Sequence, residues 1–557
     1  MASKPAPVPV EILLPGGKVL AAAGGRSLLE ISEAVSRFYP SPIVAAMVDY
    51  ELHELTSIME KPAAIRFLDL TSREGARIYQ RSLTFLLINA VYELFPEAVI
   101  TVEHSLGKGL YCEIDKKPAL SAADVVCIEE KMRQLVYMDL PIKKRKAALS
   151  EAERVFNSQL FEDKVKLLKY WPKDYLNLYS IGSLEDTLYG YHVPRTGLLG
   201  VFGLEYYRPG LILRFPDEKD PCTIPPLVEQ AKLFEIFREA EKWGSILGFD
   251  TVGAMNSLIE DKQGPEVVRV AEALHEKKIA QIADFISDRR EEIRVILVAG
   301  PSSSGKTTFT QRLRTQLLVN GLRPYPISLD DYFVDREHTP VDESNNPDFE
   351  HIEAIDLPLF NEHLLRLIGG EEVDLPIFNF ITGKREYGDR RIRLEKGQLL
   401  IIEGIHGLNE RLTCSIARGR QFKIYISALT ALNIDRHTRI HTTDTRLLRR
   451  IVRDAQFRGI DARETIRRWP SVRRGEERNI FCLQEKADIM FNSSLVYEPA
   501  VIKEYVEFLL KKIGRSEPEY IDAKRLLTFL SFFVPLAPHD VPSNSILREF
   551  IGKSCFN

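Results

Sequence analysis

Apolar and polar positions alternate at the start of the chain as they do in half-buried strands. Residues 8–14 and 17–20 alternate in this way on either side of a Pro-Gly turn, and residues 43–48 form a further strand-like run. Between them, residues 28–38 have the spacing of a short amphipathic helix. We expect a small α+β module over residues 1–70.

The next segment changes from helical to strand periodicity. Apolar residues in 75–94 recur at helical spacing, and residues 120–170 are charged and are predicted to be helical. From 176 to 215, short apolar runs alternate with Gly and Pro turns. These patterns predict a second α+β domain over residues 71–220.

A proline-rich stretch at 221–226 separates this domain from the second half of the chain. An apolar face at helical spacing then predicts a long helix at 265–293. Beyond it, strand-like runs alternate with helical ones, which is typical of a doubly wound parallel sheet that binds its ligand at the carboxyl ends of the strands. The expected parts are a helical linker at 221–292, this α/β domain at 293–515, and an apolar docking tail at 516–557.

Composition narrows the class of protein. The chain has 557 residues, of which 45% are hydrophobic and 28% charged, enough for several domains with their own cores. Its net charge of −4 predicts no general affinity for nucleic acid or anionic membranes. The cysteines form no C-x-x-C pair, and no apolar run approaches the roughly 18 residues of a membrane span. We expect a reduced, cytoplasmic protein without membrane segments.

The most specific motif lies at 300–307, where Gly-Pro-Ser-Ser-Ser-Gly-Lys-Thr fits the phosphate-loop pattern G-x-x-x-x-G-K-[ST]. It follows the apolar run 295–299 and precedes a helical run, which is the setting that such a loop requires. An accidental Gly/Ser-rich turn is the alternative. The motif predicts that nucleotide phosphates are held by Gly300, Ser302, Ser303, Ser304, Gly305, Lys306, Thr307 and Thr308.

Carboxylates follow two of the predicted strands. Asp330 comes after the strand at 325–329, which we expect to neighbour the phosphate-loop strand, and it could take a hydroxyl proton or orient a metal ion. A strand-end turn, where aspartate is common, is the alternative explanation. Glu403 follows the strand at 399–402 and, with the Thr307 hydroxyl, is a candidate ligand of Mg²⁺.

Arginines are concentrated between residues 444 and 458, on a predicted helix and its end. A charged run is usually a solvated helix face. Here arginine exceeds acid, and the excess would repel itself without a bound anion, so we expect a lid that closes over the transferred phosphoryl group. The arginines are Arg446, Arg449, Arg450, Arg453 and Arg458.

These motifs, in this order, resemble the uridine kinase and phosphoribulokinase family of P-loop kinases over residues 295–510. The resemblance also rests on Ser-Leu-Asp-Asp-Tyr-Phe at 328–333, Phe-Glu-His at 349–351 and Leu-Pro-Ile-Phe-Asn-Phe at 375–380. It implies Mg²⁺-dependent transfer of the γ-phosphate of ATP to a primary hydroxyl of a small molecule. The expected acceptor is the 5′-hydroxyl of a nucleoside similar to uridine or cytidine.

The same resemblance implies roles for individual residues. Asp330 would be the base, and Arg453 and Arg458 would close over ATP while Lys306 contacts its phosphates. Arg450 would contact the acceptor or a phosphate. The Mg²⁺ site would comprise Thr307, Glu403 and Asp330, and the acceptor would be enclosed by Phe333, Glu350, Phe378, Phe380, Arg385 and Arg450.

Departures from the family fall on the side that would read the base. Phe378 stands where uridine kinases have a base-contacting Tyr, and Gly383 where they have a His. Ile460 replaces the second arginine of their R-G-R, and Arg468 replaces a Gln. Because lost donors and acceptors change which polar edge a buried pocket can satisfy, the resemblance leaves a pyrimidine acceptor in question.

Residues 7–215 carry a second resemblance, to the N-terminal half of threonyl-tRNA synthetase, a TGS module followed by an editing-type domain. It rests on the segments 78–87 and 186–197. Where the synthetases have H-x-x-x-H and C-x-x-x-H, this chain has Arg81, Phe85 and Leu188, and it keeps only His192. One imidazole cannot form the polar cluster that hydrolysis needs, so we expect a structural His192 in a fold that has lost its chemistry.

Two other classes of function stay open. A nucleotide-gated RNA- or ribosome-associated switch would use the TGS-like module, but no N-K-x-D guanine motif follows the phosphate loop. An aminoacyl-tRNA-binding or -deacylating protein is disfavoured by the lost histidines and the acidic net charge. Within the kinase class, the second acceptor is a non-nucleoside alcohol. A homo-oligomer is compatible with the sequence, and RNA binding through the N-terminal domains is not predicted.

Overall fold

The computed structural model describes residues 9–23, 25–343, 347–430 and 432–556. The elements of the N-terminal module are β1 (Pro9–Leu13), β2 (Val19–Ala23), α1 (Leu28–Val35), β3 (Ala45–Val48), β4 (Glu51–His53) and β5 (Ala64–Leu68). Its strands form a mixed sheet in the order β2-β1-β5-β3-β4. Ser27 and Glu30 cap α1 reciprocally, and Leu28 packs with Val10 and Ile12 in the core of this module.

The second domain is built around α2 (Arg73–Leu94), which is buried along most of its length. The other elements are β6 (Val99–Leu106), β7 (Gly109–Asp115), α3 (Ala122–Tyr137), β8 (Lys143–Ala148), α4 (Leu149–Ser158), α5 (Glu162–Leu168), β9 (Tyr175–Ile181), β10 (Leu184–Asp186), β11 (Gly203–Tyr207) and β12 (Gly210–Arg214). They form two antiparallel sheets, β11-β12-β7-β6 and β10-β9-β8, which share one core with α2. Both N-terminal units are α+β, as expected.

One element contradicts the helical expectation for residues 120–170. Strand β8 pairs antiparallel with β9, from Lys143 opposite Ser180 to Ala148 opposite Tyr175. Only Ala147 of this strand is buried, because its Lys and Arg side chains lie at a sheet edge, where charge is tolerated and blunts aggregation. Pairing with β9, rather than a local apolar pattern, makes this segment a strand.

The second half contains a five-stranded sheet whose strands are all parallel. They are β13 (Val295–Ala299), β14 (Tyr325–Ser328), β17 (Leu400–Glu403), β18 (Gln421–Ser427) and β21 (Ile489–Asn492), in the order β14-β17-β13-β18-β21. β13, which is a continuous apolar run, and β18 are both buried throughout, as expected for inner strands of a parallel sheet. The doubly wound α/β fold expected from the sequence is confirmed.

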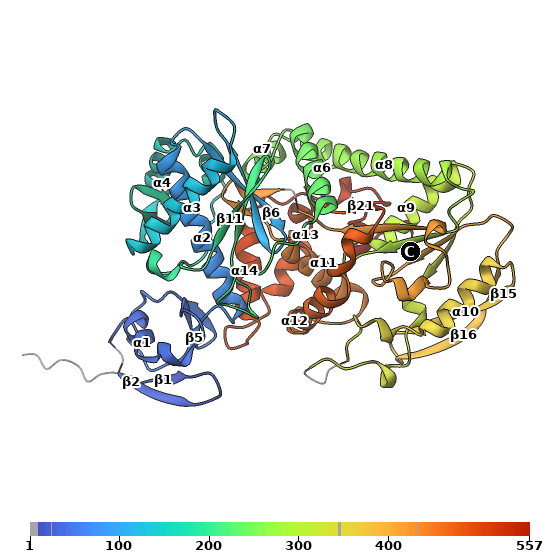
Figure 1. Ribbon diagram of the computed structural model, residues 1–557, viewed down its shortest axis with the longest axis horizontal. Coiled ribbons are helices and arrows are strands. Elements are labelled where there is room, and N and C mark those ends of the chain that lie inside the picture. Colours follow the sequence, from blue (N-terminus) through green and yellow to red (C-terminus); the bar gives the residue numbers. More distant parts are fainter. Residues whose placement is uncertain (1–8, 24, 344–346, 431, 557) are drawn as a thin grey trace, which may run out of the picture.

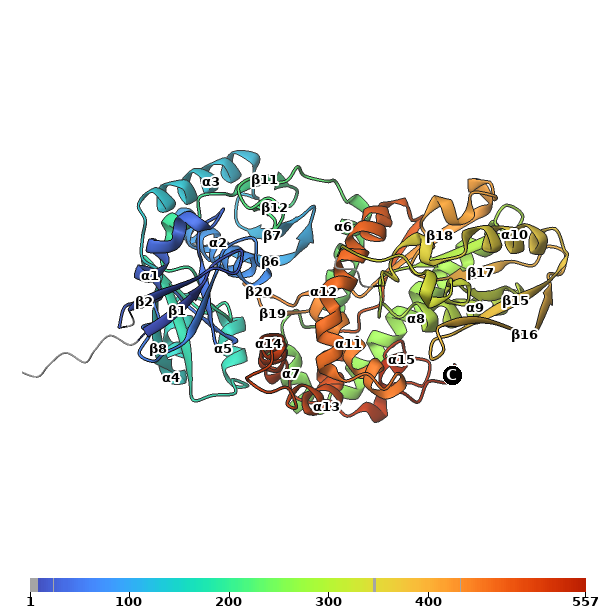
Figure 2. The ribbon, with the colours of Figure 1, turned by 90° about the horizontal axis from the view of Figure 1, so that it is seen from below.

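Helices cover both faces of this sheet (Figure 2). One face packs against α8 (Gly264–Asp288), α9 (Lys306–Val319), α11 (Thr442–Phe457), α12 (Ala462–Asn479) and α13 (Glu498–Leu510). The other packs against α10 (Leu357–Ile368) and the hairpin of β15 (Glu372–Asn379) with β16 (Lys384–Arg393). Alternate residues of β13 pack in the two cores, because successive side chains of a strand point to opposite faces. Ile296 and Val298 belong to the core on the first face, and Val295 and Leu297 to the core on the second.

The segment at 221–292 joins the two halves by packing. Besides α8 it contains α6 (Ala231–Leu247) and α7 (Val252–Glu260). Helix α6 contacts both β6 and β21, α7 contacts α5, and α8 contacts α9. In Figure 1, α7 lies next to the N-terminal domains, α6 lies near the centre, and α8 runs along the top of the α/β domain.

A small hairpin of the α/β domain, β19 (Asn433–Asp435) with β20 (Thr438–Arg439), reaches into the second domain. There Lys164 Nζ lies 3.0 Å from Oδ1 of Asp186 and 3.0 Å from Oδ1 of Asp435. His437 Nδ1 lies 2.6 Å from Oδ2 of Asp186. All of these side chains are buried, so an ionic cluster connects the two halves of the molecule.

The C-terminal tail packs onto the α/β domain through α14 (Tyr520–Ser531) and α15 (Arg548–Ile551). Leu526, Leu530, Leu547 and Phe550 are fully buried in the core that also contains α11 and α13.

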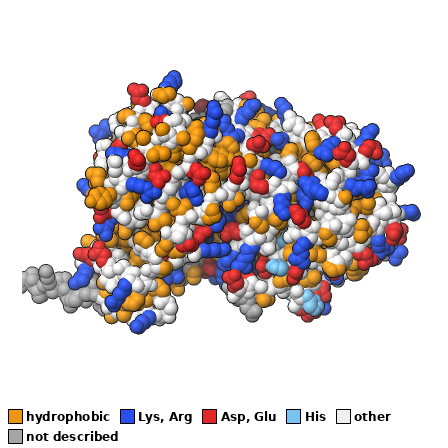
Figure 3. All heavy atoms as spheres, viewed as in Figure 1, with side chains coloured by type: hydrophobic (Ala, Val, Ile, Leu, Met, Phe, Trp, Pro, Cys, Tyr) orange, Lys and Arg blue, Asp and Glu red, His pale blue; other side chains and the backbone are white. Residues whose placement is uncertain are grey.

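On the face drawn in Figure 3, acidic and basic side chains are interspersed. Within the described residues, no helix combines the length and apolar character of a membrane span.

Candidate active site

The phosphate loop connects the end of β13 to the start of α9. Gly305 has a φ of 85°, in the left-handed region, and a Cβ at Gly300 would lie 2.2 Å from the carbonyl oxygen of Ile426. Glycine is therefore required at both positions. The loop places the first turn of α9, with N–H groups that have no helical partner, at the carboxyl edge of the sheet, where it can bind an anion.

Hydroxyl and carboxylate oxygens converge beside this loop. Thr307 Oγ1 donates to Glu403 Oε1 at 3.2 Å, and Ser328 Oγ donates to the same oxygen at 3.4 Å. Burial and the nearby Asp330 raise the pKa of Glu403 to about 7. A hydroxyl beside two carboxylates, one of which raises the pKa of the other, is an oxygen donor set that fits Mg²⁺.

Asp330 follows β14 in a short helical turn, Leu329–Tyr332. Strand β17 lies between β13 and β14, so the expectation that the Asp330 strand neighbours the phosphate-loop strand is wrong; strand order depends on long-range pairing. The carboxylate nevertheless lies in the electrostatic field of Lys306 and Arg458. Burial raises the pKa of Asp330, and Lys306 opposes this shift. Burial also lowers the pKa of Lys306.

Two arginines of α11 are structural. Arg446 and Arg449 are buried and form ion pairs with Glu476 and Glu498. Arg446 Nε also donates to the carbonyl of Ser302 at 3.0 Å. Because the acids come from later segments, they relieve the self-repulsion that the arginine run suggested. These two arginines therefore hold the phosphate loop and do not belong to a lid.

The other three arginines share one carboxylate. Asp454 lies 3.3 Å from Arg450 Nε, 3.0 Å from Arg453 Nη2 and 3.7 Å from Arg458 Nη1. Arg450 Nη1 also donates to Ser302 Oγ at 3.1 Å, which places it against the phosphate loop. Three guanidinium groups on one acid leave positive charge beside the loop, where it can bind a phosphate group.

Aromatic rings form one wall next to these arginines. The ring centroid of Phe378 lies 5.6 Å from that of Phe333 and 5.2 Å from that of Phe380. Phe378 is buried, whereas Phe380 is 54% exposed. The Arg458 guanidinium lies 5.9 Å from the Phe380 ring. This cluster offers an apolar surface to a flat ring.

Glu350 packs against α12 and lies in the electrostatic field of Arg450. A Cβ at Gly475 of α12 would lie 2.5 Å from Cβ of Glu350, so glycine is what allows the close approach. Burial raises the pKa of Glu350 to about 7, and Arg450 opposes the rise. A half-buried carboxylate facing an arginine can accept hydrogen bonds from ligand hydroxyls.

Two predicted acceptor-side residues have other partners. Arg385 stands opposite Phe378 in the β15–β16 hairpin, but its Nη1 donates to Asp356 Oδ2 at 2.8 Å. Arg468 is 58% exposed and pairs with Glu464 on its own helix. Neither guanidinium is therefore presented to an acceptor in this structure.

Gly383 and Arg336 explain one of the departures from uridine kinases. Gly383 has a φ of 70°, and a Cβ there would lie 2.8 Å from Nε of Arg336. Arg336 Nη2 donates to the carbonyl of Phe380 at 2.6 Å. The space that a side chain at 383 would need is occupied by Arg336.

Sequence reasoning missed two carboxylates that bind the phosphate loop. Glu476 Oε1 accepts the Ser302 N–H at 3.0 Å, and Glu549 Oε2, from the tail, accepts the Thr308 N–H at 3.1 Å. Glu549 lies 241 residues after Thr308, so no local pattern connects them. The local sequence around Glu549 predicted only a docking tail, from its apolar density.

Of the residues that correspond to the editing centre of the synthetases, Phe85 and Leu188 belong to the buried apolar core of the domain, whereas Arg81 donates to the Tyr191 carbonyl. His192 is buried, with Nδ1 3.4 Å from Ser82 Oγ, and its ring lies 5.4 Å from Phe85 and 4.4 Å from Tyr179. Burial lowers the pKa of His192, which disfavours the charged imidazole. The sequence prediction of a structural His192 agrees with these surroundings.

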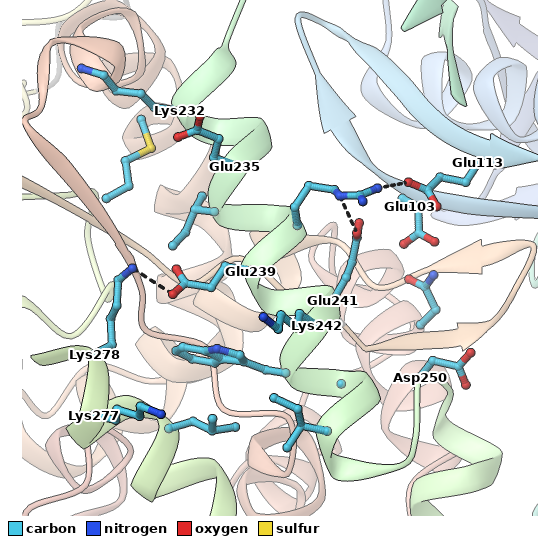
Figure 4. Close-up of a pocket in the computed structure, with 18 of the residues that line it drawn as sticks. Glu103, Glu113, Lys232, Glu235, Glu239, Glu241, Lys242, Asp250, Lys277 and Lys278 are labelled. Carbon is cyan, nitrogen blue, oxygen red and sulfur yellow. Dashed lines mark hydrogen bonds and ion pairs between the residues drawn. The ribbon is translucent and has the colours of Figure 1, made fainter. Parts of the chain in front are cut away.

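The cavity of about 1180 Å³ in Figure 4 lies away from the phosphate loop, between the β6–β7 sheet, α6 and α8. Its lining carries charges of both signs, including Glu103, Glu113 and Glu241. Burial raises the pKa of Glu103 to about 8 and that of Glu241 to about 7. None of the residues predicted for phosphoryl transfer lines this cavity.

A parallel sheet with a phosphate loop at its carboxyl edge, adjacent carboxylates and arginines on the loop defines a P-loop nucleotide-binding domain. Residues 295–496 match the Phosphoribulokinase / Uridine kinase family, so the α/β domain is a P-loop kinase domain of this family.

The N-terminal region is similar to threonine–tRNA ligases. It is 31% identical over 194 residues to the ligase of Coxiella burnetii (strain RSA 493 / Nine Mile phase I), which covers 35% of this chain and 30% of the ligase. The chain thus spans less than a third of the length of that curated relative. The recognition of a P-loop kinase domain joined to a synthetase-like N-terminal region is confirmed.

Two solved structures that are similar to part of the chain are distant in sequence. A structure described as a "Possible Uridine Kinase" from Bacillus stearothermophilus is 18% identical, with a TM-score of 0.25, and covers 38% of this chain and 97% of that one. D-glycerate 3-kinase from Cryptococcus neoformans var. grubii is 16% identical, with a TM-score of 0.23, and covers 46% of this chain and 87% of that one.

Proposed function

We propose that this protein is an ATP-dependent kinase that transfers the γ-phosphate to a primary hydroxyl of a small molecule, with the 5′-hydroxyl of a nucleoside as the acceptor. The observation that carries this proposal is the meeting of Lys306, Asp330 and Glu403 in one electrostatic environment at the carboxyl edge of the sheet. A cation beside paired carboxylates is what phosphoryl transfer to an alcohol requires.

In this proposal the N–H groups at the start of α9 bind the phosphates of ATP, and Lys306 contacts the outer ones. Arg450, Arg453 and Arg458 would neutralise charge that develops on the transferred group. Asp330 would accept the proton of the acceptor hydroxyl, which leaves the oxygen free to attack phosphorus. Mg²⁺, held by Thr307, Glu403 and Asp330, would supply further charge neutralisation at the phosphate oxygens.

The acceptor side supports a molecule with a ring and neighbouring hydroxyls. The cluster of Phe333, Phe378 and Phe380 offers an apolar wall, and the Glu350 carboxylate offers a hydrogen-bond acceptor close to Arg450. A nucleoside combines a flat base with a hydroxylated sugar, so it can use both surfaces.

A non-nucleoside alcohol is the second candidate acceptor, and a specific observation favours it. Arg336 fills the space next to Gly383, and Arg385 is bound to Asp356. The base-reading positions therefore offer fewer free polar groups than a base-specific pocket needs.

An acceptor screen tests the proposal. Purified protein with ATP and Mg²⁺ is mixed with nucleosides and, separately, with sugar phosphates, pantothenate and glycerate, and ADP release is measured. We expect acceptor-dependent ADP release with at least one nucleoside, abolished in Asp330→Asn. Turnover restricted to the other alcohols would replace the nucleoside assignment, and no turnover with any acceptor would contradict the kinase assignment.

We further propose that the N-terminal domains serve regulation or assembly in a cytoplasmic enzyme and have no hydrolytic role. The apolar surroundings of His192 support this proposal. An assay for hydrolysis of aminoacyl-tRNA esters tests it, and activity lost in His192→Ala would contradict it.

A further inference from the structure

A second cavity, of about 430 Å³, lies where the N-terminal module, the second domain and the α/β domain meet. Its walls come from the β3–β4 turn at Tyr50, from α2, from the β9 strand and the loop around Tyr191, and from α11 and α14. Figure 1 shows α14 beside α2, in agreement with the ion pair between Arg73 and Asp522. None of the phosphate-loop residues lines this cavity.

Two arginines on α2 face this cavity without matching acceptors. Arg77 and Arg81 are four residues apart, so they lie on the same face of the helix. The nearest carboxylate oxygens to Arg77 are those of Asp444 at 3.9 Å and Asp522 at 4.0 Å, beyond hydrogen-bond length. Arg81 donates one hydrogen bond, from Nη1 to the Tyr191 carbonyl at 3.0 Å. Among the described residues, neither guanidinium has another acceptor.

The surroundings of these arginines are under-neutralised. Burial, with Arg525 and Arg73 adding, lowers the pKa of Arg77 to about 9, and burial lowers that of Arg81 to about 10. Basic residues also outnumber acidic ones in the lining. The basic residues are Arg77, Arg81, Lys173, Arg439, Lys524 and Arg525, and the acidic ones are Glu51, Glu74 and Asp444. A like-charged pair at this helical spacing costs stability unless an anion lies between its members.

The rest of the lining is aromatic and apolar. Trp171, Tyr175, Tyr189 and Tyr191 line the cavity together with Phe532. Rings of this kind stack on flat groups, and guanidinium groups bind phosphate or carboxylate through two N–H donors. Inorganic phosphate would use the arginines and leave the aromatic wall unoccupied.

We propose that this cavity binds a small organic anion that carries a flat ring, with Arg77 and Arg81 holding the anionic group and the aromatic residues holding the ring. The anionic group is a phosphate or a carboxylate.

The cavity is connected to the phosphate loop through α11. Asp444, in the first turn of this helix, forms an ion pair with Arg525 and lies 3.9 Å from Arg77. Further along the same helix, Arg446 and Arg450 donate to Ser302 of the loop. An anion that draws Arg77 away from Asp444 alters the electrostatic support of a helix that holds the loop. We therefore expect the ligand to change the KM for ATP; this part rests on the proposed kinase function.

Binding is tested without any kinase assay. The fluorescence of 8-anilinonaphthalene-1-sulfonate, a ringed anion, is measured with the full-length protein in saturating ATP and Mg²⁺, which keep the nucleotide site filled. Only the signal displaced by competitors is counted. We expect phenyl phosphate or phenylacetate to displace the probe and neutral benzyl alcohol to leave it bound. Displacement by phenyl phosphate alone assigns a phosphate ligand, and by phenylacetate alone a carboxylate ligand. Equal displacement by benzyl alcohol, or none by either anion, overturns the proposal.

Variants locate the site. Arg81→Gln is expected to weaken the displaceable binding by about tenfold, and Arg81→Lys, which keeps the charge but loses the paired N–H donors, is expected to weaken it by a smaller factor. Arg133→Gln is the matched control, because Arg133 is a half-exposed arginine elsewhere in the same domain. Melting temperatures show whether each variant is folded. Wild-type binding in folded Arg81→Gln overturns the proposal. If binding is lost as expected but the anion leaves the KM for ATP unchanged, the binding site stands and the coupling through α11 is wrong.

Discussion

The phosphate loop and the Lys164 cluster both bury charged side chains, but they are neutralised to different degrees. Lys164 lies 3.0 Å from carboxylates of both Asp186 and Asp435 and donates to the Thr187 carbonyl at 3.0 Å. At the loop, the Asp330 carboxylate accepts no hydrogen bond from the described residues, and three arginines share Asp454. Full pairing is what an interface between domains needs, whereas incomplete pairing leaves charge for a ligand.

The two regions should therefore respond in opposite ways to loss of a charge. Removing a charged side chain at the loop should abolish catalysis and leave the fold intact, because that side chain pairs with a substrate and not with another side chain. Removing a partner in the Lys164 cluster should destabilise the fold, because no solvent or ligand can replace it.

The largest effect is expected at the loop. Lys306→Ala and Asp330→Asn should each lower acceptor-dependent kcat by about a thousandfold or more, because each removes a group that acts on the transferred phosphoryl group or its acceptor. The melting temperature should change little. Exposed Lys396→Ala serves as the control. Turnover near that of the wild type in either variant would remove that residue from the mechanism.

Lys164→Met should lower the free energy of unfolding by about 3–5 kcal/mol, because it leaves two buried carboxylates without their cation. Although burial alone would lower it, Asp186 and Asp435 raise the pKa of Lys164, in agreement with a charged amine. Chemical denaturation measures the loss, and exposed Lys166→Met on the same helix is the matched control. Equal stability of the two variants would show that the cluster does not hold the halves together.

Glu549→Gln should lower the KM for ATP by about threefold to tenfold, since the carboxylate occupies an N–H group at the anion-binding end of α9. Steady-state kinetics at saturating acceptor measure the change. Asp540→Asn, in the same tail, is the control and should have no effect. An unchanged or higher KM for ATP in Glu549→Gln would mean that the tail carboxylate does not compete with the nucleotide.

The smallest effect is expected at Glu103, whose carboxylate lies in the electrostatic field of Glu113, Glu241 and Asp250 in the cavity of Figure 4. Its pKa in the folded protein is raised to about 8, above its ordinary value, so stability is full at low pH and is lost as the pH rises through the folded pKa. Glu103→Gln should remove this loss and stabilise the protein by about 1–2 kcal/mol at about pH 8, with a smaller gain near about pH 5. Thermal melts across this range measure it, and a gain independent of pH would contradict the assignment.

Much of the nucleotide side could be predicted from the sequence because its signals are local. The loop at 300–307 and the carboxylates that follow two strands are defined by short motifs next to apolar runs. The order of strands was not predictable in this way, and β17 separates the Asp330 strand from the loop strand. Strand β8 was also missed, because the segment forms a strand by pairing with β9 and has no local apolar pattern that would predict one.

The acceptor side was less predictable because its contacts join distant segments. Phe378 and Glu350 were found through motifs, but the partner of Arg385 and the position of Arg336 depend on packing between loops. The same holds for Arg446, whose acid partner comes from α12.

The sequence by itself determined that the chain contains a phosphate loop, carboxylates at strand ends and an arginine-rich helix, because short motifs fix local backbone and chemistry. Only the tertiary structure decided which charges are neutralised. It paired Arg446 and Arg449 with acids, brought Glu549 of the tail to the loop, and left Arg77 and Arg81 incompletely paired in a cavity between domains. The energy of a charge depends on the groups packed around it, and those groups come from every part of the chain.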